Sequence, residues 1–295
     1  MRPVFIVGTG RSGTSLLYRT IVLHSDFFVG EVCLEESRVF AESTRILQRL
    51  HAEEKNPLYE YMLRDDELFQ AFVGAVYKTA VIQRVPDAVT RRCWGWPYPL
   101  RVWSAMGGRR IVNEFFRHAK AARGGKRIVE KTPSHVKCIE YMFSEFPECR
   151  ILSTVRHPID VYTSYVRRRE TKHEDWLNVS VESFVRRYRE DMREAEKYAN
   201  NERFRTVDYD NFTRRPERTF EGICDFLGVE FESDPIEGNV PSLSDWKPDP
   251  YLSEPISPST KKPEKYISES DARKIQTRLK STMERWGMKT KLLST

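Results

Sequence analysis

The chain has 295 residues, of which 39% are hydrophobic, 12% are aromatic and 31% are charged. This composition excludes an intrinsically disordered protein, which lacks the apolar side chains needed for a core. The net charge of +6 predicts a weak attraction for polyanions, but not a histone-like one. The number of cysteines is odd, at five, and none has Cys-x-x-Cys spacing, so we expect buried, reduced thiols without a disulfide framework or a thiolate zinc site.

Four short apolar runs predict strands that are buried on both faces. They lie at residues 3–7, 127–130, 150–155 and 203–209. Each run leads into a segment with helical spacing of its apolar residues. Strands that alternate with helices indicate a parallel α/β sheet.

Several residues mark where the connecting helices begin and end. Ser134 is the predicted N-cap of an amphipathic helix, and Pro158 suits the first turn of the next one. Gly228 predicts the end of a third helix. Ser268 and Asp271 form a capping-box pattern that begins the last helix.

Two regions fit no strand. Residues 241–263 contain six prolines, which predicts a long surface loop. Residues 30–126 have a mainly helical pattern, which we interpret as an insertion that shapes a substrate site. We therefore expect a single domain over residues 1–295, with this insertion and this loop.

A glycine-rich turn joins the first strand to the first helix. Residues 8–15 read Gly-Thr-Gly-Arg-Ser-Gly-Thr-Ser, and a tight turn at a helix N-terminus directs backbone N–H groups at phosphate oxygens. The glycine spacing matches a Walker loop, but Thr14 stands where a nucleotide triphosphatase has lysine, and the cation is Arg11. A P-loop kinase or NTPase is the alternative, although no clear magnesium-binding aspartate follows an apolar strand.

A second anion-binding pattern follows the third strand. Arg156 stands at the strand end, and Ser164 lies about two turns into the next helix. A guanidinium and a hydroxyl in this arrangement suit a second phosphate. The alternative for Arg156 alone is a surface ion pair. Two phosphate sites on neighbouring strands suggest a bisphosphorylated nucleotide.

These motifs together resemble those of the sulfotransferases. Residues 4–17 look like the family's 5′-phosphosulfate loop, in the Arg-Ser-Gly-Thr form shared by tyrosylprotein sulfotransferases and many bacterial relatives. Arg156 with Ser164 is similar to the 3′-phosphate motif. Residues 130–133, Glu-Lys-Thr-Pro, resemble the lysine-bearing strand end, and residues 207–212 resemble the landmark whose tyrosine lies near the adenosine.

The resemblance implies a P-loop-like, five-stranded parallel sheet flanked by helices. It also implies 3′-phosphoadenosine-5′-phosphosulfate (PAPS) as donor, adenosine 3′,5′-bisphosphate (PAP) as product, and in-line sulfuryl transfer to a hydroxyl or amine without a metal. The implied donor-binding residues include a late basic segment similar to one that closes over the phosphates. They are Gly10, Arg11, Ser12, Gly13, Thr14, Ser15, Arg156, Ser164, Tyr209, Ser259, Lys261 and Lys262.

Sulfuryl transfer needs positive charge at the leaving oxygen and a base for the acceptor proton. The resemblance points to Arg11 and Lys131 for the charge. For the base we choose Glu31, which follows a glycine as in the tyrosylprotein branch, although Val32 replaces that branch's second glutamate. The rival bases are Glu35, Glu36 and His135.

The region that precedes the second strand carries most of the positive charge. Residues 84–127 hold eleven Lys or Arg and two acids, interleaved with tryptophans. This pattern favours an acidic glycan or acidic peptide over a small neutral alcohol, and a solvated basic helix is the alternative. The candidate acceptors are therefore an anionic glycan, a peptide (for example one that contains tyrosine) or a small hydroxylated metabolite. A polyanion-binding module would leave the phosphate motifs unexplained, so we expect no nucleic-acid partner; the sequence makes no prediction of oligomeric state.

No segment predicts a membrane anchor. The apolar run at residues 3–7 is too short for a signal peptide, and no stretch approaches the roughly 20 apolar residues of a membrane span. Because the phosphate loop begins within ten residues of Met1, we expect a cytoplasmic bacterial enzyme.

Overall fold

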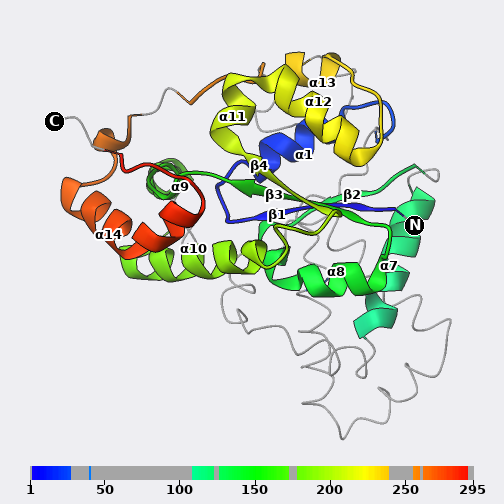
Figure 1. Ribbon diagram of the computed structural model, residues 1–295, viewed down its shortest axis with the longest axis horizontal. Helices are drawn as coiled ribbons and strands as arrows, with labels where there is room; N and C mark the ends of the chain where they lie inside the picture. The colour runs from blue at the N-terminus through cyan, green and yellow to red at the C-terminus, as the bar shows by residue number, and fades with distance from the viewer. Residues whose placement is uncertain are drawn as a thin grey trace, which may run out of the picture.

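The chain forms a parallel sheet with helices on both faces (Figure 1). The computed structural model describes residues 2–27, 40, 108–122, 126–172, 178–238, 255–259 and 262–291. The strand order within these residues is β2-β1-β3-β4. The strands are β1 (Val4–Gly8), β2 (Val129–Lys131), β3 (Arg150–Val155) and β4 (Phe204–Asp208).

All four predicted strands are confirmed, and every neighbouring pair is parallel. The fifth strand implied by the resemblance has no counterpart in the residues that the structure describes. The helices that surround the sheet are α1 (Thr14–Val22), α7 (Gly108–Ala122), α8 (Ile139–Glu145), α9 (Pro158–Lys172), α10 (Val181–Glu196), α11 (Tyr209–Arg214), α12 (Pro216–Leu227), α13 (Asp234–Glu237) and α14 (Glu269–Arg285).

The central strand β1 sends its side chains to two different apolar clusters. Val4 and Ile6 pack in the cluster that contains residues of α1 and α12. Phe5 and Val7 point to the opposite face and pack with residues of α7 and α8. This separation follows from the alternation of side chains along a strand, and it explains why β1 is apolar throughout.

A third cluster lies at the carboxyl ends of the strands, where α9, α10 and α14 pack together. The N-cap of α14 is the predicted one, because the Ser268 hydroxyl accepts a hydrogen bond from the Asp271 N–H at 3.0 Å. Helix α12 ends at Gly228, whose φ of 68° is left-handed, as expected for a C-terminal glycine.

The prediction of Ser134 as an N-cap is wrong. A 3₁₀ helix, η1 (Pro133–Cys138), begins one residue earlier, and α8 follows it directly from Ile139. Proline at the first helical position has its φ already set and no N–H to leave unpaired. Pro133 therefore begins the helical segment, and Ser134 lies inside it.

Most of the predicted insertion and most of the proline-rich loop lie outside the described residues. Within the insertion, α7 buries Val112, Phe115 and Phe116 against the sheet. Within the loop region, the short 3₁₀ helix η4 (Pro263–Lys265) precedes α14. In the described part of the chain, no helix is both long and apolar enough to cross a membrane.

Three of the five cysteines can be described. Cys138, Cys149 and Cys224 are buried and have free thiols, in agreement with the expectation from the sequence. Burial raises the pKa of each thiol, to about 11 for Cys224. Cys33 and Cys93 lie outside the described residues.

Candidate active site

The loop between β1 and α1 leaves the N-terminus of α1 open to an anion. Gly13 is the N-cap in a left-handed conformation, no side chain in the described part of the chain caps α1, and its first turn contains no acidic residue. The first N–H groups of a helix have no intrahelical partner and carry the positive end of the helix dipole. This helix start is therefore suited to bind phosphate or sulfate oxygens.

Ser12 ties this loop to the neighbouring strand. Its hydroxyl donates to the Thr9 carbonyl at 2.5 Å and lies 2.6 Å from the Thr154 hydroxyl. Because the Ser12 hydrogen is used on Thr9, the Thr154 hydroxyl must be the donor in the second bond. Ser12 is buried, and its side-chain bonds fix the shape of the loop; its contact with the donor stays a prediction.

Arg11 brings the two predicted phosphate motifs together. Its φ of 70° lies in the left-handed region, which costs a non-glycine residue about 1–2 kcal/mol. Its Nε donates to the Ser164 hydroxyl at 3.3 Å, and its carbonyl accepts from Nη1 of Arg156 at 3.5 Å. The strain is retained at the point where the loop, β3 and α9 meet, as is common at functional sites.

Tyr209 and Arg156 form the wall beside this loop. The Arg156 guanidinium lies over the Tyr209 ring, 4.1 Å from its centre. The same ring packs on Gly13, where an added Cβ would stand 2.2 Å from Tyr209 Cδ2. Tyr209, the first residue of α11, therefore contacts both phosphate motifs.

Arg156 supplies the clearest sign that an anion fits here. The residue is 8% exposed, and its buried Nε has no hydrogen-bond partner among the described residues. A buried guanidinium N–H without an acceptor is costly. A bound phosphate would provide the missing acceptor.

Lys131 reaches the same helix start from the other side. It lies opposite Ile6 in the β1–β2 register, so its side chain points to the face that α1 covers. Lys131 is completely buried, and its Nζ donates to the Ser15 hydroxyl at 3.2 Å. An ammonium group therefore stands beside the first turn of α1.

Positive charge accumulates around Arg11. Burial, followed by the nearby guanidinium groups of Arg168 and Arg156, lowers the pKa of Arg11. Tyr165 instead raises the pKa of Arg11. Its hydroxyl packs on Gly10, where an added Cβ would stand 2.5 Å from the oxygen. Concentrated positive charge raises the local concentration of anions.

Glu130 and His135 occupy the opposite face of β2. The His135 Nδ1 lies 3.2 Å from Glu130 Oε2, and the Thr132 hydroxyl donates to Glu130 Oε1 at 2.6 Å. Glu130 and His135 are completely buried, and Phe40 packs edge-on against the imidazole at 5.2 Å. Of the four candidate bases, only His135 is described, and its ring is closed off from solvent.

The remaining predicted site residues are not brought to this place by the described structure. Glu31 and Lys261 lie outside the described residues, as do Glu35 and Glu36. Ser259 and Lys262 are exposed on either side of the undescribed residues 260–261. Their role at the donor phosphates stays a prediction.

The sequence interpretation missed three residues that shape the loop. They are Thr154, which bonds Ser12; Tyr165, which packs on Gly10; and Arg168, which adds charge near Arg11. Arg168 lies four residues after Ser164 on α9, and this spacing places both on one helix face. From this spacing, the sequence could have indicated that Arg168 lies near the predicted phosphate site.

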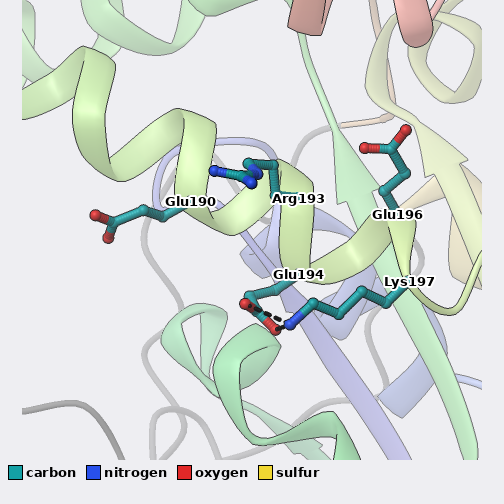
Figure 2. Close-up of a pocket in the computed structure, with 5 residues that line it drawn as sticks. All are labelled: Glu190, Arg193, Glu194, Glu196 and Lys197. Carbon is teal, nitrogen blue, oxygen red and sulfur yellow. Dashed lines mark hydrogen bonds and ion pairs between the residues drawn. The ribbon is translucent and has the colours of Figure 1, made fainter.

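A separate depression on α10 does not resemble a binding site (Figure 2). Only exposed or half-exposed charged side chains line it, and Lys197 is already paired with Glu194 at 2.7 Å. The described residues contain no group of three or more His, Cys, Asp or Glu that can hold a metal. The anion-binding junction at Arg11 is therefore the candidate active site.

Curated proteins that match the chain in sequence are sulfotransferases. The chain is 24% identical over 254 residues to the omega-hydroxy-beta-dihydromenaquinone-9 sulfotransferase Stf3 of Mycobacterium bovis and of Mycobacterium tuberculosis. The similarity covers 78% of this chain but 64% of those relatives, so it spans less than two thirds of their length.

Two solved structures share the fold. The sulfotransferase domain of the Synechococcus PCC 7002 olefin synthase has a TM-score of 0.60 and 18% identity, with 98% of this chain and 95% of that chain covered. The sulfotransferase domain from the curacin biosynthetic pathway has a TM-score of 0.54 and 14% identity, with 98% and 99% covered. The model of the Sulfotransferase family matches residues 3–233, which is well over half of the chain and includes both phosphate motifs; the protein therefore belongs to the sulfotransferase family.

Proposed function

We propose that this protein transfers a sulfuryl group from PAPS to a hydroxyl acceptor and releases PAP. One observation carries the proposal beyond family membership. The Arg11 side chain bonds Ser164 and its carbonyl accepts from Arg156, so the helix-start anion site and the strand-end anion site adjoin. A donor with phosphates on both its 5′ and 3′ positions matches two adjoining but distinct sites.

The residues of the first site are suited to the reacting end of the donor. The open N-terminus of α1 would hold the 5′-phosphosulfate, between the Arg11 and Lys131 cations. When bound, the donor supplies the sulfuryl group and a phosphate leaving group. Arg11 and Lys131 would stabilise the negative charge that develops on the leaving oxygen, because preorganised cations act most strongly where charge builds up.

The residues of the second site are suited to the end of the donor that does not react. Arg156 and Ser164 would bind the 3′-phosphate, with Arg156 Nε as a donor that the described residues leave unsatisfied. Tyr209, beneath the Arg156 guanidinium, would lie near the adenosine. These contacts would orient the donor without changing during the reaction.

For the acceptor we propose a hydroxyl compound. The curated relatives are named for an omega-hydroxy menaquinone, which carries a hydroxyl, and the basic residues of 84–127 favour one that also bears negative charge. Glu31 stays our proposal for the base that takes the hydroxyl proton. Lys261 and Lys262, with Ser259, would cover the donor phosphates.

Calorimetric titration with PAP in the absence of magnesium tests the donor site. We expect micromolar binding by the wild type and a loss of about ten- to hundredfold in Arg156→Ala, since a charge-assisted hydrogen bond contributes about 1.5–3 kcal/mol. Arg150→Ala is the matched control. Arg150 stands at the other end of β3, donates to the Glu202 carbonyl at 2.8 Å and stacks on an aromatic ring.

Magnesium-dependent binding of ATP in place of PAP would contradict the proposal and favour a kinase or NTPase. Equal loss of affinity in Arg150→Ala and Arg156→Ala would refute the assignment of the 3′-phosphate. Transfer from labelled PAPS to a panel of neutral and anionic hydroxyl compounds then identifies the acceptor class. Absence of transfer to every hydroxyl compound, with transfer to an amine, would refute the acceptor proposal.

A further inference from the structure

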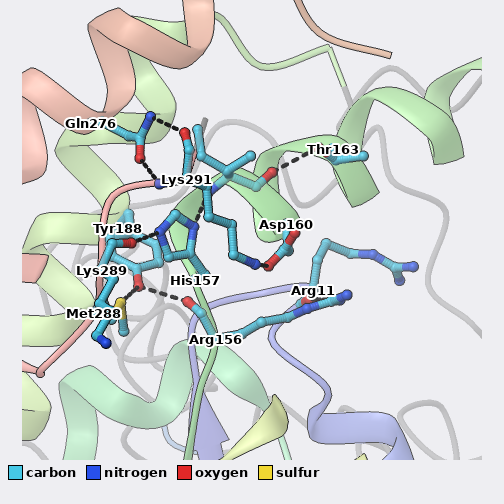
Figure 3. Close-up of polar contacts among 11 residues, drawn as sticks. Arg11, Arg156, His157, Asp160, Thr163, Tyr188, Gln276, Met288, Lys289 and Lys291 are labelled. Carbon is cyan, nitrogen blue, oxygen red and sulfur yellow. Dashed lines mark hydrogen bonds and ion pairs between the residues drawn. The ribbon is translucent and has the colours of Figure 1, made fainter. Parts of the chain in front are cut away.

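The C-terminal segment, residues 288–291, is attached to two helices near Arg156 (Figure 3). The side-chain amide of Gln276, on α14, clamps the Lys291 backbone: Nε2 donates to the carbonyl at 2.9 Å, and Oε1 accepts from the N–H at 2.7 Å. The Lys291 ammonium pairs with the Asp160 carboxylate in the first turn of α9. The segment thus joins α14 to the start of α9.

His157 connects this segment to the residue that follows Arg156. Its Nδ1 accepts a hydrogen bond from the Ile159 N–H at 3.2 Å, so Nδ1 carries no proton. The proton is then on Nε2, which donates to the Lys289 carbonyl at 3.0 Å. Burial, together with the positive charge of Lys291, lowers the pKa of His157 and favours this neutral form.

Tyr188, on α10, holds Arg156 itself. Its hydroxyl donates to the Arg156 carbonyl at 2.8 Å and lies 3.6 Å from the sulfur of Met288. Tyr188 is 1% exposed, so this bond is shielded from water. The Arg156–His157 backbone is therefore fixed by α10 on one side and by the C-terminal segment on the other, as Figure 3 shows.

We propose that residues 288–291 form a strap that holds the Arg156–His157 backbone in place, with Tyr188 and His157 as positioning residues for the donor site. The proposal rests on the proposed function, because it takes Arg156 as the 3′-phosphate ligand. A long arginine side chain binds well only when its backbone is fixed, since every additional degree of freedom is lost on binding. The strap supplies that restriction from outside the binding site.

The chain contains a matched control for the Tyr188 hydroxyl. Tyr162 is also buried, belongs to the same apolar cluster, and donates its hydroxyl to a backbone carbonyl, that of Val179, at 3.3 Å. That bond does not reach Arg156. Removing either hydroxyl costs a buried hydrogen bond of similar kind, but only Tyr188 acts on the donor site.

PAP affinity by calorimetry is the first test, on the full chain. We expect Tyr188→Phe, which removes one hydrogen bond to Arg156, and Gln276→Ala, which removes two to Lys291, each to weaken PAP binding about three- to tenfold. Tyr162→Phe should leave the affinity unchanged while it lowers the melting temperature as much as Tyr188→Phe does. Equal affinities in all variants, or equal losses in the two tyrosine variants, would overturn the proposal.

Amide hydrogen exchange separates a failure of the strap from a failure of the proposed function. Gln276→Ala should speed exchange at the Ile159 amide, which the strapped His157 imidazole protects, whether or not PAP binds. Unchanged exchange there would overturn the strap. Absence of PAP binding by the wild type, or no effect of Arg156→Ala, would refute the donor-site assignment, and the exchange result would then decide the strap alone.

Discussion

Replacing Gly13 by alanine should damage the donor site through Tyr209. The added Cβ would stand 2.2 Å from Cδ2 and 2.8 Å from Cε2 of the tyrosine ring, whereas carbon atoms pack at about 3.5–4.0 Å. The ring would have to move by more than about 1 Å and lose its place beneath Arg156. We therefore expect Gly13→Ala to weaken PAP binding.

The magnitude has two parts that can be separated. The φ of 102° at Gly13 costs alanine about 1–2 kcal/mol of folding free energy. Loss of the guanidinium–ring contact costs about 0.5–2 kcal/mol, and if the bound state needs this contact to place Arg156, the upper limit of the loss in PAP affinity is roughly two- to thirtyfold. Gly228→Ala is the control, because Gly228 has a φ of 68° and no atom within 4 Å of its added Cβ.

Calorimetry and thermal unfolding of four variants provide the assay. Gly13→Ala and Gly228→Ala should both lower the melting temperature, but only Gly13→Ala should weaken PAP binding. In a Tyr209→Ala background the same Gly13 change should have little further effect on affinity, because the clash is gone. Wild-type affinity in Gly13→Ala, or full additivity with Tyr209→Ala, would refute the reasoning.

Two further variants test other charges of the structure. Lys131→Met should lower the single-turnover transfer rate with saturating donor by about a hundred- to thousandfold, and methionine keeps the apolar stem, so the variant should still fold; a near-wild-type rate would exclude Lys131 as the catalytic cation. Burial raises the pKa of Asp191 to about 7, although the positive charges of Lys137 and Arg187 act to lower it. The folded state therefore favours the protonated carboxyl, and the contribution of Asp191 to stability is lost as the pH rises from about 4 to about 7. The free energy of unfolding of Asp191→Asn, measured in urea, should therefore rise by about 2 kcal/mol relative to that of wild type between pH 5 and pH 8. A difference between the two proteins that stays constant over this pH range would contradict the raised pKa.

The strands and the phosphate loop were predictable because each depends on local sequence. A strand covered on both faces must be apolar along its length, as residues 3–7 are. The loop needs glycine at positions 8 and 13, where φ is positive, and a helix start next to it, and residues 8–15 carry both signals. The order of these motifs along the chain was enough to indicate the family.

Contacts between distant segments were not predictable in this way. The Ser12–Thr154 bond spans 142 residues, and it depends on the parallel register of β1 and β3. Tyr188 belongs to α10, a helix that the sequence interpretation left out although Ser180 caps it and Phe184 and Val185 mark its apolar face. The sequence pattern could have predicted the helix, but it could not have predicted the hydrogen bond from Tyr188 to the Arg156 carbonyl.

The crowding of cations at Arg11 predicts that ligand binding and stability are coupled. Like charges packed near one another destabilise the ligand-free fold, by about 1–3 kcal/mol for a close pair near a protein surface. Arg11→Gln removes this repulsion and keeps the left-handed backbone penalty, because glutamine, like arginine, has a Cβ. We expect the variant to melt a few degrees higher than wild type without ligand.

A bound anion should reverse the order of the melting temperatures of wild type and Arg11→Gln. Sulfate, at an ionic strength matched with chloride, should raise the melting temperature of the wild type, because it binds the folded state and neutralises the site. In Arg11→Gln most of that rise should disappear, whereas Arg150→Gln, at the far end of β3, should keep it. If Arg11→Gln melts below wild type in chloride and gains as much from sulfate, Arg11 supports the fold instead of the ligand, and the anion must bind at another place.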